Sequence, residues 1–224
     1  MDSADNDMTY YDLTIDKYLQ IRQILIEHTG EDIEIQAELL AVLNECTVDD
    51  LLDLPLSEYK KKVRDIAFLS EPLDPKPQCP KSVTIDGEEY DVIRDVKKFT
   101  AGEYIDYETL IKSENFYEVI PNILACFIVP KGKNYGRDYD IMEVAEKIKN
   151  NLSIGFAMDV CFFFQMRSIR SINRMLDYLV LTTKIQMRKA SNRETKMKLK
   201  MAAQKIQELR DSFNDGPGSI IRMR

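Results

Sequence analysis

The sequence has few of the residues that build metal or catalytic sites. His28 is the only histidine among 224 residues, and the four cysteines, Cys46, Cys79, Cys126 and Cys161, lie far apart with no Cys-x-x-Cys pair. A zinc site needs Cys and His ligands at close spacing, so we expect no metal site and interpret the cysteines as reduced thiols. His28 lies near the end of a predicted helix, where its charge suits the helix dipole, and we assign it a structural role.

Motifs of the common catalytic and nucleotide-binding sites are also absent. The sequence contains no Gly-x-Ser-x-Gly, P-loop, Gly-x-Gly-x-x-Gly or His-Glu-x-x-His pattern. Acidic pairs such as Asp49-Asp50 and Glu88-Glu89 lie at predicted caps and turns, where carboxylates are expected for local reasons. We therefore predict a protein that is not an enzyme and that uses no cofactor.

Neither a leader nor a membrane-spanning segment is predicted. The first twelve residues, MDSADNDMTYYD, have neither the basic nor the apolar region of a signal peptide. The longest apolar run, residues 154–166, contains Asp159 and is too short to cross a bilayer. We expect no membrane contact and a protein that stays in the compartment where it is made.

The sequence does show a strong separation of charge. Residues 166–224 hold 14 Lys and Arg against 5 Asp and Glu, a balance of +9. Residues 1–165 hold 17 against 33, a balance of −16. Such asymmetry between two parts of one chain is typical of proteins that meet a charged partner.

Capping residues and apolar spacing predict a helical region over residues 1–70. Four helices are expected, over residues 15–28, 33–45, 48–54 and 57–69. Thr14 and Thr47 are suitable N-caps for the first and third helices, Gly30 is a suitable stop for the first, and Ser57 begins the fourth. The region ends where residues 70–80, SEPLDPKPQCP, bring four prolines into eleven positions. Because proline interrupts helices and central strands, we interpret residues 71–81 as a linker and a domain boundary.

Residues 82–152 are predicted to form a hairpin followed by helices. Two alternating runs flank Asp86-Gly87, a dipeptide typical of tight hairpin turns. Thr100 and Glu103 form a capping-box pattern, and Asp140 with Glu143 suggests a further cap. The expected helices cover residues 101–111, 115–128 and 141–150, with a loop over residues 130–139.

Residues 153–224 are predicted to form long basic helices and a tail. Apolar residues fall at alternating spacings of three and four, which is a helix-packing seam: Ile169, Ile172, Leu176, Leu179 and Thr183, then Leu199, Ala202, Ile206, Leu209 and Phe213. Ser191 and Glu194 form a capping box between the two runs, so the segment is either an antiparallel hairpin or one bent helix. The predicted fold is mainly α: a helical bundle with one small β-hairpin and a long, coiled-coil-like C-terminal segment.

The basic residues of these helices are the candidate partner-binding site. They are Arg167, Arg170, Arg174, Lys184, Arg188, Lys189, Arg193, Lys196, Lys198 and Lys200. Three interpretations remain open, in the order of our preference. The helices contact the acidic part of a neighbouring subunit, they present an ordinary solvated face, or they contact nucleic acid phosphates. Aromatic residues are nearly absent from this stretch, which disfavours stacking on single strands.

Several segments give the chain a resemblance to a known group of proteins. They are the opening helix TIDKYLQIRQIL, the turn DLPLSEY, the hairpin VTIDGEEYDV, and the stretches FTAGEYIDYETL and IPNILACFIVPKGKNYG. In this order the chain resembles small proteins encoded among the structural genes of tailed bacteriophages of gut bacteria, including crAss-like phages. Residues 83–164 are also similar to tail assembly chaperones of long-tailed phages. The resemblance implies a role in the virion or its assembly, in many copies, with no catalytic residues.

Our first hypothesis is a non-catalytic virion or assembly protein of the tail or head–tail region. It would bind further copies of itself and other phage structural proteins, in the host cytoplasm during assembly and then in the virion. The first alternative is a tail assembly chaperone that is absent from the mature particle. The second is a nucleic-acid-associated regulator that uses the basic C-terminal helices.

Overall fold

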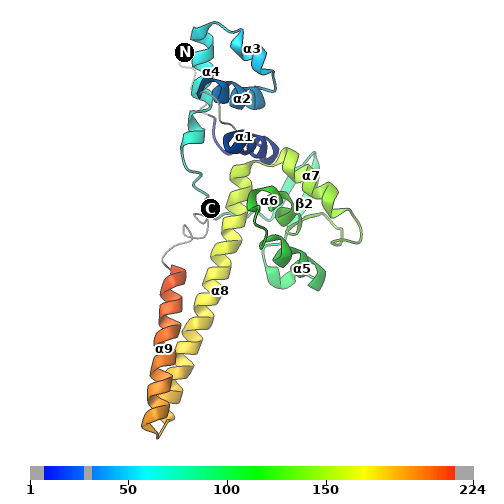
Figure 1. Cartoon of the computed structure of the whole chain (residues 1–224). Helices are drawn as coiled ribbons and strands as arrows, with labels where there is room; N and C mark the ends of the chain where they lie inside the picture. The colour runs from blue at the N-terminus through cyan, green and yellow to red at the C-terminus, as the bar shows by residue number, and fades with distance from the viewer. Residues whose placement is uncertain (1–7, 28–31, 215–224) are drawn as a thin grey trace, which may run out of the picture. The chain divides into compact units, whose positions relative to one another are not determined.

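The structure, a computed structural model, describes residues 8–27 and 32–214. These residues form nine α-helices, two short 3-10 helices and one three-stranded antiparallel sheet (Figure 1). The predicted fold, mainly helical with a small antiparallel sheet element and a long C-terminal helix, is therefore confirmed. Within the described ranges, no helix combines the length and apolar character needed to cross a membrane.

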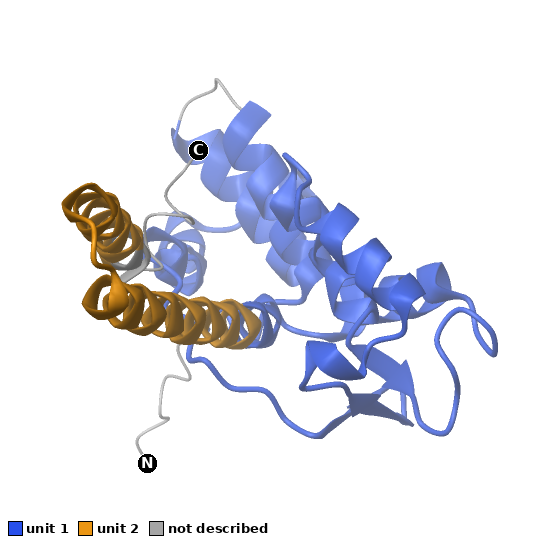
Figure 2. Ribbon diagram, turned by 90° about the horizontal axis from the view of Figure 1, so that it is seen from below, with its two compact units in different colours: residues 1–161 blue, residues 162–224 orange. Residues whose placement is uncertain are grey.

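The chain divides into two compact units, residues 1–161 and residues 162–224 (Figure 2). The sequence predicted regions at residues 1–70, 71–81, 82–152 and 153–224, so the first three fall inside one unit. The boundary also lies within helix α8 (Ile154–Lys189), whose first residues belong to the first unit. Contacts between segments distant in sequence, described below, explain why these regions are not separate.

The N-terminal region is a group of short helices. They are α1 (Ile15–Glu27), α2 (Asp32–Asn44), α3 (Val48–Leu52), α4 (Leu56–Asp65) and the 3-10 helix η1 (Ala67–Ser70). Thr47 caps α3 as predicted, because its side chain accepts the Asp50 N–H at 3.2 Å while the Asp50 carboxylate accepts the Thr47 N–H at 2.9 Å. Helix α4 begins at Leu56, directly after Pro55 and one residue before the predicted Ser57. Gly30 and His28 lie outside the described residues.

The chain before α1 satisfies the first turn of α8. The first N–H groups of a helix have no partner within the helix. Here the Ile154 N–H donates to the Leu13 carbonyl at 2.8 Å, and the Gly155 N–H donates to the Tyr10 carbonyl at 2.9 Å. In return the Ile15 N–H donates to the Leu152 carbonyl at 3.0 Å. Residues 10–15 and the start of α8 are thereby joined within the first unit.

The proline-rich segment is packed inside the first unit and does not separate two domains. It has no helix or strand, as its prolines predict. However, Cys79 is buried, and the Lys76 N–H donates to the buried carboxylate of Asp159 at the start of α8. The expected boundary at residues 71–81 therefore corresponds to a fixed connection inside one unit.

The predicted hairpin forms, and a third strand extends it. The strands are β1 (Ser82–Ile85), β2 (Glu88–Val92) and β3 (Ile128–Pro130), in the order β1-β2-β3. Asp86 and Gly87 both have positive φ, 52° and 77°, as a type I′ turn requires. Strand β3 pairs with β2 through Val92 and Ile128. The predicted helix over residues 115–128 is therefore too long, because a short, continuous apolar run does not distinguish a buried strand from a helix end.

Three helices complete the first unit. They are α5 (Ala101–Leu110), α6 (Phe116–Ala125) and α7 (Ile141–Asn151), preceded by the 3-10 helix η2 (Val96–Lys98). The predicted Thr100–Glu103 capping box is present. Asp140 caps α7 by accepting the Met142 N–H at 2.8 Å, without the predicted help of Glu143. Helix α6 packs on α7, and fully buried Ile120, Leu124 and Ile148 contribute to this core.

The second unit consists of the rest of α8 and helix α9 (Arg193–Asn214). Helix α9 folds back along α8 as an antiparallel hairpin rather than continuing as one bent helix (Figures 1 and 2). Its N-cap is Asn192, whose side chain accepts the Glu194 N–H at 2.8 Å, and not the predicted Ser191. The break falls where the sequence predicted it, although the capping residue differs.

Candidate functional site

All ten predicted partner-binding residues are exposed on the second unit. Six lie on α8 and four lie on α9: Arg167, Arg170, Arg174, Lys184, Arg188 and Lys189, then Arg193, Lys196, Lys198 and Lys200. Lys198 pairs with Glu194 one turn away, at 2.6 Å. This unit, residues 162–224, carries 14 basic against 5 acidic residues. Its charged face is therefore open to a partner.

The seam between α8 and α9 follows the predicted pattern only in part. Leu176 is buried, and Ile169, Ile172, Leu199 and Ile206 are half-buried. Leu179, Ala202 and Leu209 are exposed, whereas their neighbours Val180 and Ala203 are half-buried. The side chain of Phe213 lies outside the described residues. Thr183, the next predicted position on α8, is also half-buried. The face that a helix packs against its partner is about 100° wide, so Val180 and Ala203, next to predicted positions, share the contact.

A second stripe of residues runs along α8 away from this seam. It consists of Arg170, Arg174, Tyr178, Leu181, Ile185 and Arg188, at spacings of 4, 4, 3, 4 and 3, which place them on one helix face. We call these six residues the outer stripe. Tyr178 is 65% exposed, Leu181 57% and Ile185 42%. The outer stripe thus has an uncovered apolar middle with arginines at both ends.

Sequence reasoning had found the arginines of the outer stripe but not its apolar middle. The signal was present, because Tyr178, Leu181 and Ile185 follow helical spacing on a face distinct from the seam. Met197 and Met201, four residues apart on α9, are also exposed. Two helices alone leave much of their apolar surface in contact with water. Exposed apolar residues that gather in one stripe mark an interaction surface more often than scattered ones do.

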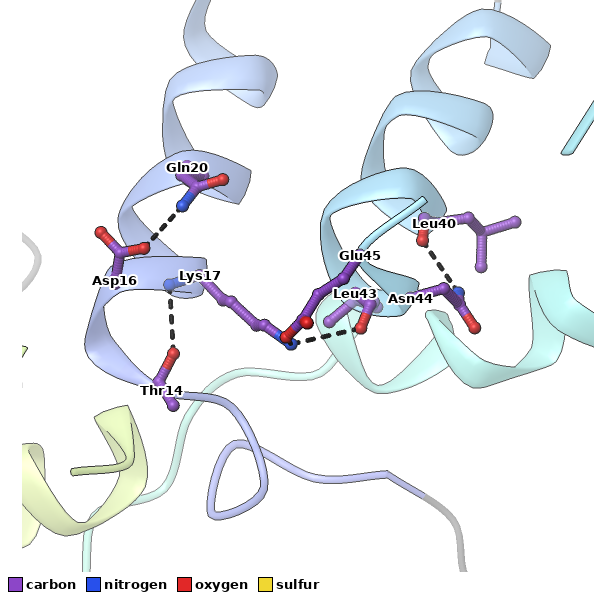
Figure 3. A network of polar contacts seen from close by, with 8 residues as sticks. All are labelled: Thr14, Asp16, Lys17, Gln20, Leu40, Leu43, Asn44 and Glu45. Atoms are coloured by element: carbon purple, nitrogen blue, oxygen red, sulfur yellow. Dashed lines mark hydrogen bonds and ion pairs between the residues drawn. The ribbon is translucent and has the colours of Figure 1, made fainter. Parts of the chain in front are cut away.

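The first unit has a polar network where α1 meets the end of α2 (Figure 3). Lys17 of α1 reaches the Glu45 carboxylate at 2.7 Å and the Leu43 carbonyl at 3.4 Å. Glu45 has a φ of 54°, and the Cys46 N–H donates to the Ala41 carbonyl at 3.2 Å. These are features of a Schellman helix end. The ammonium of Lys17 lowers the pKa of the Glu45 carboxyl and faces the negative end of α2.

The same network continues toward α7. Asp16, next to Lys17, accepts a hydrogen bond from Gln20 (Figure 3). Asp16 also pairs with Lys149 at 2.8 Å. This contact raises the pKa of the Lys149 ammonium. The network therefore fixes the end of α2, from which the chain enters α3 and α4.

The cluster that most resembles a reactive site is built from Asp106, Cys126 and Tyr135. The Tyr135 hydroxyl donates to Asp106 at 3.0 Å and lies 3.6 Å from the Cys126 sulfur. Burial raises the pKa of the Cys126 thiol to about 11 and that of the Cys161 thiol to about 12. A nucleophilic cysteine needs a lowered pKa, so both thiols have the opposite electrostatics. Among the described residues, no group of three His, Cys, Asp or Glu side chains is placed to hold a metal ion.

Comparison with known proteins adds no relative to this picture. No protein-family model, curated protein or solved structure matches the chain.

Proposed function

We propose that this protein is a non-catalytic virion or assembly protein of a tailed bacteriophage, placed in the tail or head–tail region. It acts by associating with further copies of itself and by docking on other phage structural proteins. It works in the host cytoplasm during assembly and then in the virion. The phage setting rests on the resemblance of the sequence segments described above. The mode of action rests on the outer stripe and on the opposite charges of the two units.

The outer stripe of α8 is the observation that carries the mode of action. Its three large apolar residues are exposed in the single chain, although covering them would remove apolar area from water at a gain of about 25 cal/mol per Å². The arginines at its ends favour a partner surface with negative charge. A protein surface with apolar and acidic residues meets both requirements.

Opposite charges on the two units make a second copy a suitable partner. Residues 162–224 carry a balance of +9, whereas residues 1–161 hold 17 basic and 33 acidic residues, a balance of −16. Contact between unlike surfaces of identical chains is heterologous when the two copies do not exchange it reciprocally, and it then generates rings or open filaments. Rings and tubes are suited to a tail or head–tail structure.

Nucleic acid ranks below protein as the partner. A phosphate-binding face gains from continuous positive charge, but the middle of the outer stripe is apolar over Tyr178, Leu181 and Ile185. The rival regulator would bind duplex DNA with an affinity that falls steeply over a salt series, and a titration by fluorescence anisotropy measures this. Tight, salt-dependent binding by a monomer would favour that rival.

Light scattering coupled to size exclusion tests self-association. We expect oligomers at about 50 mM salt that dissociate in part at about 500 mM salt, because salt screens exposed charges. A monomer under both conditions, at protein concentrations up to the millimolar range, would overturn the proposal. Mass spectrometry of purified phage particles then separates the virion component, present in a fixed copy number, from a chaperone, which is absent.

A further inference from the structure

We propose that the outer stripe of one copy binds a defined acidic corner on the first unit of a second copy. The corner is formed by Asp49, Leu52, Asp53, Leu56 and Glu58, at the connection between α3 and α4. This inference rests on the proposed self-association and adds to it the two surfaces that meet.

The acidic corner combines apolar and negative side chains that are all exposed. Leu52 is 54% exposed and Leu56 64%. Asp49, Asp53 and Glu58 are exposed close to them in the sequence, and none of the three carboxylates forms an ion pair with another described residue. Residues 49–58 contain no Lys or Arg. The corner therefore offers apolar residues for the apolar middle of the outer stripe and carboxylates for its arginines.

Buried neighbours and a helix cap hold the backbone of the corner in place. Leu51, between the exposed residues, is buried, and the capping box of Thr47 and Asp50 fixes the start of α3. Tyr59, one residue after the corner, is buried and its hydroxyl donates to the Ile33 carbonyl at 3.2 Å. A surface that is already ordered loses little conformational entropy on binding.

The length of the outer stripe and its charge both suit the acidic corner. Residues 170–188 of α8 extend over about 27 Å at 1.5 Å per residue, enough to receive the two short segments of the corner. In the proposed contact Leu52 and Leu56 cover the apolar middle, Tyr178, Leu181 and Ile185. The carboxylates of Asp53 and Glu58 then face the arginines at the two ends.

Charge also argues against two outer stripes binding each other. Each outer stripe carries three arginines and no acidic residue, so a symmetric contact between two of them would place like charges together, which is unfavourable. The corner belongs to the unit of opposite charge. The contact therefore joins unlike surfaces of two copies.

Charge reversal tests the contact, with a matched control. The variant D53K/E58K reverses one acid at a helix end and one in the first turn of α4. The control E114K/E118K reverses an exposed acid before α6 and one in the first turn of α6, so both variants change the net charge by the same amount. Sedimentation velocity at low salt should show self-association weakened at least about tenfold by D53K/E58K and nearly unchanged by the control. Circular dichroism confirms that both variants are folded.

Mixing variants distinguishes contact between copies from contact within one chain. R174E/R188E should also fail to associate alone. In a mixture of the two variants, the natural outer stripe of D53K/E58K can bind the natural acidic corner of R174E/R188E. The two reversed surfaces also carry opposite charges and can bind each other. Assemblies that contain both proteins should therefore form.

The failed outcomes separate the two proposals. If wild-type protein associates but D53K/E58K behaves like the control, or if the mixture stays monomeric, the acidic corner is not the partner surface while self-association stands. If wild-type protein is itself monomeric, both proposals fail.

Discussion

The hydroxyl of Tyr11 donates a hydrogen bond to the carboxylate of Asp159, 148 residues further along the chain, at 3.0 Å. The same carboxylate accepts the Lys76 N–H of the proline-rich segment. Asp159 is 7% exposed, and a buried carboxylate is costly without such partners. Three distant segments, residues 9–15, residues 71–81 and the start of α8, are therefore joined at one side chain.

The Tyr11–Asp159 hydrogen bond predicts a stability effect. Tyr11→Phe removes one donor from a buried carboxylate and should lower the free energy of unfolding by about 1–3 kcal/mol. The control is Tyr104→Phe, which removes a hydroxyl bonded to Glu108 on the exposed face of α5 and should have no measurable effect. Urea unfolding followed by circular dichroism gives both values. Equal effects of the two variants would contradict the role of Asp159.

Two glycines in helices should respond in opposite ways to alanine. A Cβ on Gly155 would lie 2.8 Å from the Tyr11 ring and 3.1 Å from the Tyr10 carbonyl, so Gly155→Ala forces the N-terminal segment away and should cost about 1–3 kcal/mol. A Cβ on Gly102 would have only the Thr100 hydroxyl nearby, at 3.9 Å. Gly102→Ala should therefore stabilise the protein by up to about 1 kcal/mol through helix propensity. Thermal unfolding measures the change in stability of both variants. A stabilising effect of Gly155→Ala would contradict the close approach of Tyr10 and Tyr11 to Gly155.

The features that sequence reasoning placed correctly are local ones. The Thr47 and Thr100 capping boxes and the Asp86-Gly87 turn depend on residues within four positions of one another. Strand β3 and the pairing of residues 10–15 with residues 152–155 depend on partners more than thirty residues away. A capping residue reveals that a helix begins, but not which distant segment will cover that helix. This is why the proline-rich segment resembled a linker.

The candidate site shows the same division. Composition alone identified the basic residues of α8 and α9, since charged side chains on a two-helix hairpin are exposed almost wherever they lie. The seam positions could be predicted only in part, because the packed face of a helix is wide enough to include Val180 beside the predicted Leu179. The apolar middle of the outer stripe was overlooked because each helix was assigned a single apolar face.

We expect the buried thiol of Cys126 to stabilise the protein less at alkaline pH. Burial raises the pKa of its thiol from the ordinary value of 9.0, which holds in the unfolded chain, to about 11. As the pH rises past 9 the unfolded chain loses this proton first, so the contribution to stability is complete below pH 9 and is lost by about pH 11. Cys126→Ala should therefore destabilise the protein at pH 8, and the difference in free energy of unfolding from wild type should become smaller toward pH 11.

The control Leu124→Ala removes a neighbouring core side chain that has no titratable group. Its effect on the free energy of unfolding should therefore be the same at both pH values. A difference for Cys126→Ala that is constant with pH would contradict this assignment.

The two faces of α8 predict a separation of stability from assembly. Leu176 is buried in the second unit, so Leu176→Ala should cost about 2 kcal/mol or more and lower the unfolding temperature. Tyr178→Gln with Ile185→Gln changes two exposed residues of the outer stripe to polar residues of good helix propensity. This double variant should keep the wild-type unfolding temperature when measured at a dilution where the protein is monomeric. At high concentration it should associate at least about tenfold more weakly, because apolar area in the contact is lost. If instead the double variant unfolds earlier as a monomer, Tyr178 and Ile185 serve the fold of the hairpin, and the outer stripe is not a surface kept open for a partner.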